Sequence, residues 1–175
     1  MGGIVAIRRM TTEELSRVSE VDVSESGSIV YECVDGDIRV TSEEWHRPRR
    51  NADEWKSYIE KWTDVLERGG AAVGAFDGNV LVGIAVLRYR LTESMAQLAA
   101  LFVSREYRRQ GIGTRLTQRL IRLAKEEGGR ELYVSATPSK SAVGFYTSRG
   151  FRLAEQVNKE LYELEPEDIH MIRAL

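Results

Sequence analysis

A short turn between an apolar run and an amphipathic run constrains this fold more than any other feature. Residues 96–103 predict a strand, and residues 114–127 have the periodicity of a helix that packs one face on a core. Between them lies a turn that contains Gly111 and Gly113. The unpaired N–H groups at a helix N-terminus and the positive end of its dipole favour an anion, most often a phosphate. We therefore expect an anion site at this turn.

The runs on either side of the turn predict an α/β or α+β domain built on one mixed sheet. Strands are expected at residues 4–8, 71–76, 80–89, 95–103, 131–136, 151–154 and 169–172. Helices are expected at residues 11–21, 51–68, 114–127 and 138–148. An extra hairpin is expected where Asp35-Gly36-Asp37 separates two alternating runs, at residues 29–34 and 38–41. Residues 45–50 are interpreted as a linker, and the segment that holds Glu165 to Asp168 as a polar loop.

Length and composition narrow the class of protein. A chain of 175 residues predicts a single domain over residues 1–175. A formal net charge of −2 argues against nucleic acid as a partner. Cys33 is the single cysteine, and His46 and His170 lie far apart in the sequence, so no metal-ligand spacing is present. No apolar run approaches the ~20 residues of a membrane span, and the N-terminus lacks the order of a signal peptide, which predicts a cytoplasmic protein without a membrane partner.

Two common nucleotide motifs do not match the turn. A P-loop needs Lys and then Ser or Thr after its second glycine, whereas Gly113 is followed by Thr114 and Arg115. The dinucleotide fingerprint needs a third glycine where this chain has Leu116. What remains is Arg108-x-x-Gly111-x-Gly113, a weak pattern when taken alone.

A second motif downstream makes the pattern specific. Residues 142–151 read Ala-Val-Gly-Phe-Tyr-Thr-Ser-Arg-Gly-Phe. Together with the turn, and in this order, they resemble the GCN5-related N-acetyltransferase superfamily. The resemblance covers residues 71–155, the expected cofactor-binding core. It implies a mixed, mostly antiparallel sheet of about seven strands with about four flanking helices.

The resemblance also implies acetyl-CoA as cofactor and assigns the residues that hold it. The turn amides would bind the pyrophosphate, and the strand before the turn would pair its main chain with the pantetheine arm. Ser139 stands where the family often has an asparagine that contacts the coenzyme. The implied cofactor-binding residues are Leu101, Phe102, Val103, Arg108, Arg109, Gln110, Gly111, Ile112, Gly113, Thr114, Ser139 and Tyr146.

One catalytic group is assigned by the resemblance, and the other is chosen from the residues alone. Tyr146 matches the family tyrosine near the coenzyme sulfur, a general acid or hydrogen-bond donor to the departing thiolate. Family members often carry an acid on the strand before the turn, and residues 96–103 contain none. Glu93, just ahead of that strand, is the first choice for the base. The alternatives left open are Glu32, Glu43, Glu44, His46 and Ser135 acting through water.

The acceptor side is expected in residues 24–62, the segment that varies in the family. Tyr31 and Trp45 are predicted to line the pocket, and abundant acidic residues there would suit a cationic amine. The leading function is transfer of acetyl from acetyl-CoA by direct attack of an amine, with a small molecule favoured over a protein. The alternatives are a non-catalytic acyl-CoA-binding module and a protein-binding domain. A homodimer is implied only by what is common in the family.

Overall fold

The computed structural model describes residues 3–175 and places a seven-stranded sheet at the centre of the molecule. The strand order is β1-β4-β5-β6-β7-β9-β8, and β2 and β3 form a separate two-stranded sheet. Only the pairing of β6 with β7 is parallel. The mixed, mostly antiparallel sheet and the extra hairpin predicted from the sequence are therefore confirmed.

The boundaries of the elements follow the apolar runs closely. The strands are β1 Ala6–Met10, β2 Glu25–Val34, β3 Asp37–Arg47, β4 Ala71–Asp77, β5 Val80–Arg88, β6 Met95–Val103, β7 Glu131–Ala136, β8 Arg152–Leu153 and β9 Ile169–Ala174. The helices are α1 Ala52–Glu67, α2 Ile112–Glu126, α3 Lys140–Ser148 and α4 Lys159–Leu164, and η1 Glu13–Glu20 and η2 Arg105–Tyr107 are 3₁₀ helices. No helix in residues 3–175 is long and apolar enough to cross a membrane.

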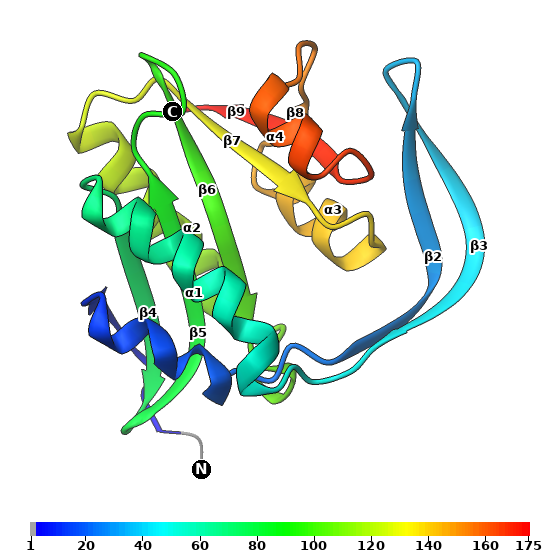
Figure 1. Cartoon of the computed structure of the whole chain (residues 1–175). Coiled ribbons are helices and arrows are strands. Elements are labelled where there is room, and N and C mark those ends of the chain that lie inside the picture. Colours follow the sequence, from blue (N-terminus) through cyan, green and yellow to red (C-terminus); the bar gives the residue numbers. More distant parts are fainter. Residues whose placement is uncertain (1–2) are drawn as a thin grey trace.

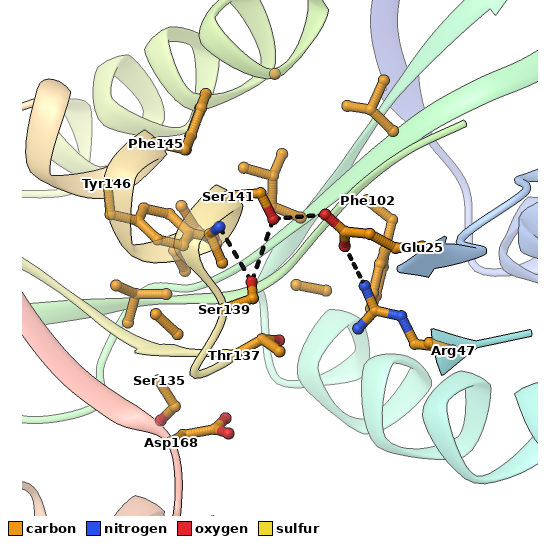
Figure 2. Close-up of a pocket in the computed structure, with 18 of the residues that line it drawn as sticks. Glu25, Arg47, Phe102, Ser135, Thr137, Ser139, Ser141, Phe145, Tyr146 and Asp168 are labelled. Atoms are coloured by element: carbon orange, nitrogen blue, oxygen red, sulfur yellow. Dashed lines mark hydrogen bonds and ion pairs between the residues drawn. The ribbon is translucent and has the colours of Figure 1, made fainter. Parts of the chain in front are cut away.

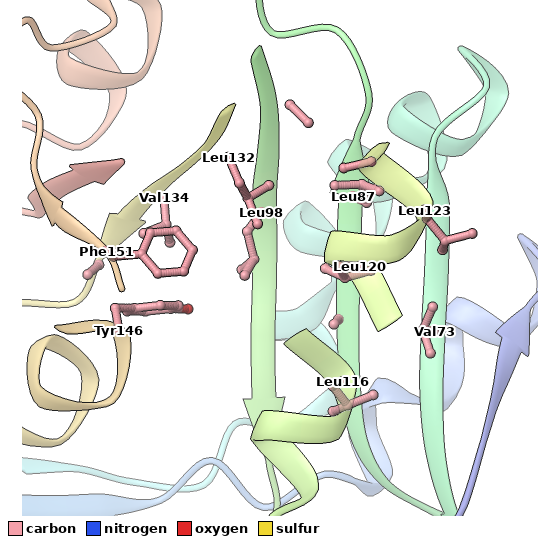
Figure 3. Close-up of a cluster of buried hydrophobic side chains, with 14 of the residues drawn as sticks. Val73, Leu87, Leu98, Leu116, Leu120, Leu123, Leu132, Val134, Tyr146 and Phe151 are labelled. Carbon is pink, nitrogen blue, oxygen red and sulfur yellow. The ribbon is translucent and has the colours of Figure 1, made fainter. Parts of the chain in front are cut away.

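Helices cover both faces of the sheet (Figure 1). On one face, η1 and α1 bury Leu15, Trp55 and Trp62 against β4 and β5. On the other face, α2 and α3 pack their apolar sides on the sheet, where Leu120 and Tyr146 belong to one continuous cluster (Figure 3). Each helix has a single apolar face, so burying that face on the sheet is the main source of its stability.

The sheet divides between β6 and β7. The two strands pair only from Met95 to Gln97, against Glu131 to Tyr133, and beyond this point no pairing joins them. From there β7 pairs with β9, whereas β6 continues beside β5. A gap therefore opens within the sheet toward the carboxyl ends of β6 and β7 (Figure 1).

The β2–β3 hairpin arcs away from the sheet toward α3 (Figure 1). Asp35 and Gly36 at its tip have φ of 53° and 82°, the left-handed conformations that a two-residue type I′ turn requires. Along the hairpin, the Tyr31 amide donates to the Pro138 carbonyl at 2.9 Å, which ties β2 to the start of α3.

Three local predictions were wrong. The helix predicted at 11–21 is a 3₁₀ helix, although Glu14 does accept from the Thr11 amide as a capping box requires. The expected linker at 45–50 begins as strand, because β3 extends to Arg47. The polar loop before β9 holds the six-residue helix α4, whose N-cap Asn158 accepts from the Leu161 amide.

Candidate functional site

A cavity of about 1340 Å³ occupies the gap between β6 and β7. It reaches from the turn before α2, past Tyr146 of α3, to the segment before β9 that ends at Asp168. Figure 2 shows its polar side chains, which come from the hairpin, β7, α3 and the segment before β9. The cavity therefore joins the predicted anion site to the opposite side of the sheet.

The turn before α2 presents free amide groups to this cavity. Arg109 and Gly111 adopt φ of 59° and 80°, so the chain reverses within three residues. Within residues 3–175, the amides of residues 111 to 114 have no hydrogen-bond partner, and the first bond of the helix is donated by Arg115 to the Gly111 carbonyl. This geometry is a backbone nest at a helix N-terminus, which binds anions.

The two glycines of the turn are needed for different reasons. A Cβ on Gly111 would meet nothing within 4 Å, so its positive φ is what favours glycine there. A Cβ on Gly113 would lie 3.2 Å from Cε2 of Phe145, so a larger residue would push against α3. The first glycine shapes the nest, and the second allows α2 and α3 to lie close together.

The side chains of the turn divide into structural and free groups. Arg108 does not face the cavity as a free cation: its guanidinium donates to the carbonyls of Val103, Ser24 and Asp22 at 3.0, 3.1 and 3.4 Å. The exposed Arg109 lines the cavity and makes no side-chain hydrogen bond or ion pair within the described residues. Of the two predicted phosphate contacts, only Arg109 is therefore free to reach an anion.

Three further residues of the turn were predicted to bind the cofactor. Thr114 lines the cavity, and its hydroxyl accepts from Arg149 at 3.1 Å. Gln110 and Ile112 do not line it. The side-chain amide of Gln110 donates to the Glu106 carbonyl at 2.8 Å, and the Ile112 side chain is buried in the core. For these two, only the main chain can take part.

The edge of β6 that faces β7 is open beyond Gln97. Leu101, Phe102 and Val103 line the cavity, and β5 occupies only the other edge of the strand. The register with β5 shifts at Ala99, which is a bulge in β6 beside the cavity. An extended ligand can therefore add to this edge as a further strand would, through main-chain hydrogen bonds.

Tyr146 and Ser139 come from α3 and its N-cap. Tyr146 is 7% exposed, packs edge-on against Phe145 and Phe151, and lines the cavity without a hydrogen-bond partner in residues 3–175. Burial raises the pKa of Tyr146 above its ordinary value, so the phenol keeps its proton and can donate it in a hydrogen bond. The Ser139 hydroxyl caps α3 by accepting from the Ala142 amide at 3.2 Å.

A polar network closes one side of the cavity (Figure 2). Glu25 of β2 accepts from the Ser141 hydroxyl at 2.5 Å and from Arg47 of β3 at 2.7 Å. Ser141 in turn lies 3.2 Å from the Ser139 hydroxyl. The base of the hairpin is thereby joined to the N-terminus of α3.

The far side of the cavity carries Ser135, one of the alternative bases expected from the sequence, and Asp168, which the sequence did not single out. Asp168, just before β9, and Ser135 of β7 lie beside each other there (Figure 2). Burial, together with the nearby charges of Glu165 and Glu167, raises the pKa of Asp168 to about 7. Tyr58 and Trp62 of α1 form the aromatic part of the wall.

Of the sequence-based choices for the base and the acceptor pocket, only Ser135 lines this cavity; the other alternative bases, Glu32, Glu43, Glu44 and His46, do not. Glu93 is exposed in the loop before β6, at the opposite end of the strand from the turn, so the chain does not bring it to the site. Tyr31 packs against the core under α3, and its amide is tied to Pro138. Trp45 lines a separate cavity of about 480 Å³ beside Gly27 and Phe145, with its indole donating to the Ile29 carbonyl.

The donor set of the cavity fits an acyl-CoA. The nest at residues 111–114 suits a pyrophosphate, the open edge of β6 suits an amide-bearing arm, and Tyr146 offers a hydroxyl further in. All of these groups belong to the lining of one continuous cavity.

The family model that matches is that of the acetyltransferase (GNAT) family, over residues 37–151. A curated relative from Drosophila melanogaster, named "Probable N-acetyltransferase san", is 29% identical over 123 residues, which span 67% of this chain and 66% of the relative.

Solved structures share the fold across nearly the whole chain. A nourseothricin acetyltransferase superposes with a TM-score of 0.75 at 16% identity, and the match covers 97% of this chain and 98% of that one. The PaiA N-acetyltransferase from Thermoplasma acidophilum, solved in complex with coenzyme A, superposes with a TM-score of 0.62 at 18% identity and covers 98% and 99%. At this identity, the likeness concerns the fold.

Proposed function

The chain belongs to the acetyltransferase (GNAT) family, and we propose that it transfers an acetyl group from acetyl-CoA to the amine of a small molecule. The observation that carries the proposal is the cavity between β6 and β7, whose lining extends from a nest of free amides to residues of α1 and of the segment before β9. A donor held at one end and an acceptor held at the other would meet beside Tyr146.

The donor end would hold acetyl-CoA mainly through the main chain. The amides of residues 111–114 would bind the pyrophosphate, with Arg109 adding charge from the surface. The edge of β6 at Leu101–Val103 would pair with the pantetheine arm, and an amide of that edge could donate to the carbonyl oxygen of the thioester. Bound acetyl-CoA supplies the activated acetyl group.

Tyr146 would act on the leaving sulfur. A buried phenol with a raised pKa keeps its proton at neutral pH, so it stabilises a developing thiolate as a hydrogen-bond donor. The phenol lines the cavity and has no competing partner in residues 3–175, which leaves it free for that contact.

The acceptor end supports a compact, cationic amine. The acidic residues Glu165, Glu167 and Asp168 all line the cavity. Acidic side chains attract an ammonium group.

The test is release of free thiol from acetyl-CoA in the presence of a panel of amines: polyamines, amino acids, aminoglycosides and peptides. We expect release with small cationic amines and a C–N bond in the product, detected by mass spectrometry. Tight coenzyme A binding without release from any amine would instead support the alternative, a non-catalytic acyl-CoA-binding module. Release with peptides alone would overturn the small-molecule assignment.

Two further proposals concern the cellular location and the oligomeric state of the protein. One is the cytoplasmic location expected from the sequence, and the other is a homodimer, which is common in the family. Cell fractionation tests the first, and light scattering coupled to size-exclusion chromatography tests the second.

A further inference from the structure

Only four carboxylates line the cavity, and three of them are poorly placed to take a proton. Both oxygens of Glu25 are engaged, one by Ser141 and the other by Arg47. Glu165 and Glu167 are exposed to solvent in the segment before β9, whereas Asp168 lies beside the buried hydroxyl of Ser135 (Figure 2). No histidine lines the cavity.

Asp168 differs from these residues in its surroundings. It is partly buried, lies directly before β9 and makes no ion pair within residues 3–175. Its neighbour across the strand pair is β7, since Ile169 pairs with Ala136. This places Asp168 at the carboxyl end of β7, beside the gap in the sheet.

Ser135 provides a second, independent observation. Its hydroxyl oxygen is buried and has no hydrogen-bond partner in the described structure. A buried hydroxyl without a partner lowers the stability of the fold unless a ligand or a water forms a hydrogen bond with it. Val134 and Ala136 pack with α2 and α3, so the alternation of a strand directs Ser135 to the opposite face. That is the side on which Asp168 lines the cavity (Figure 2).

The same alternation applies on β6. Ala96 and Leu98 belong to the cluster under α2, so Gln97 points to the opposite face, and its side chain, 9% exposed, also lines the cavity. Gln97 and Ser135 are therefore polar groups directed to the face that carries Asp168. They mark this face as the place where a polar acceptor would lie.

We propose that Asp168 is the general base of the acetyl transfer, and that the Ser135 hydroxyl positions the acceptor nitrogen or a bridging water beside it. This inference rests on the proposed function. In the step, one proton moves from the ammonium nitrogen of the acceptor to the Asp168 carboxylate. The freed nitrogen lone pair then forms the C–N bond with the acetyl carbon, and the C–S bond breaks. The second proton of the nitrogen goes to the departing sulfur, and Asp168 releases its proton to solvent.

The protonation behaviour of Asp168 suits this role. A base with a pKa of about 7 is ionised to a useful extent at neutral pH and binds a proton more strongly than an exposed carboxylate. The charged groups that share the cavity with it are Glu165 and Glu167 on its own segment, Glu25, Arg47 and Arg50 beyond, and Arg105, Arg108, Arg109 and Arg149. The rate should therefore rise with pH through about 7 and level off above it.

The decisive experiment compares Asp168→Asn with wild type on two amines at pH 8. Ethylamine has a pKa near that of lysine, ~10, and must lose a proton before it can attack. In 2,2,2-trifluoroethylamine the fluorine atoms lower the pKa below the assay pH, so this amine arrives already deprotonated. We expect kcat to fall about 100-fold with ethylamine and less than about threefold with the fluorinated amine.

Glu163→Gln is the matched control, because it removes an exposed carboxylate of α4 that does not line the cavity. It should leave the ratio of the two rates unchanged. With ethylamine, the rate of the Asp168→Asn protein should keep rising with pH toward the pKa of the amine, with no plateau above 7.

A stability measurement separates a base from a structural carboxylate. Because its folded pKa is raised, Asp168 makes the fold less stable as pH rises from about 4 to about 7. Asp168→Asn should thus melt no lower than wild type at pH 8. Equal losses of rate on both amines, with a lower melting temperature, would overturn this inference alone. A wild-type protein that releases no thiol with any amine would overturn the proposed function and the inference with it.

Discussion

The two ends of the cavity are built from different parts of the chain. At the end near α2, the anion site is formed mainly by main-chain amides of the turn at residues 108–114. The residues that this turn requires are glycines, which have no side chain. At the other end, the polar groups are side chains from β6, β7, α1 and the segment before β9. One end is thus a local backbone shape, and the other is assembled by tertiary contacts.

This difference predicts which kind of substitution should impair binding at each end of the cavity. A backbone nest is lost when its conformation changes, and it tolerates most changes of side chain. An assembled pocket is sensitive to individual side chains and tolerant of small changes in the backbone around them. The substitutions below test that contrast.

The largest effect is expected from Gly111→Val. A β-branched residue at φ of 80° costs ~1–3 kcal/mol, which would distort the nest and weaken coenzyme A binding about 10- to 100-fold. Gly128→Val is the matched control, since Gly128 has φ of 82° and equally open space at the other end of α2. Isothermal titration with coenzyme A should show weak binding for the first variant and normal binding for the second. Normal binding by both would mean that the nest is not the anion site.

Tyr146→Phe should lower turnover by about tenfold or more while leaving coenzyme A affinity within about twofold. The ring and its packing on Phe145 and Phe151 are kept, and only the hydroxyl that would stabilise the thiolate is removed. Tyr162→Phe, on the exposed surface of α4, is the control. A loss of affinity in Tyr146→Phe would assign the hydroxyl to cofactor binding instead.

Substitutions of the two neighbouring arginines of the turn should have different effects, one on the stability of the fold and the other on coenzyme A binding. Arg108→Met removes three hydrogen bonds to carbonyls and should cost about 1–3 kcal/mol of unfolding free energy, measured by urea denaturation. Arg109→Met should leave stability within about 0.5 kcal/mol and weaken coenzyme A binding a few-fold, more at low salt than at high salt. The reverse pattern would exchange the two roles.

The smallest effect is expected from Glu93→Gln. Glu93 is exposed in the loop before β6 and does not line the cavity. Its removal should change kcat by less than about twofold with any amine that turns over. A large loss of kcat would restore Glu93 as the base and contradict the role proposed for Asp168.

The parts of the fold that could be predicted from the sequence are those made by neighbouring residues. The meander of β4, β5 and β6, the Asp35-Gly36 turn and the capping box of α1, in which Asn51 and Glu54 cap each other, all follow from patterns within a few residues. The helix α4 escaped prediction because six residues are too few to show helical periodicity.

The errors in the site have a different cause. Tyr31, Trp45 and Glu93 were chosen for their chemistry and their position in the sequence, and the direction of a side chain on a strand depends on its pairing. Arg108 and Arg109 are adjacent and chemically identical, so only the fold shows which one is tied to the carbonyls of Asp22 and Ser24. Asp168 stands more than twenty residues beyond Tyr146, and the pairing of β9 with β7 is what brings it to the cavity.

The sequence by itself indicated the turn before α2, the candidate anion site, and, through its order with the Tyr146 motif, the family. Both depend on backbone conformation and on spacing within short segments, which glycine positions and periodicity report directly. The tertiary structure alone decided where β6 and β7 separate, and which carboxylate stands at the far end of the gap between them. Those depend on the pairing of strands distant in sequence, and such pairing is the sum of many contacts that no short segment contains.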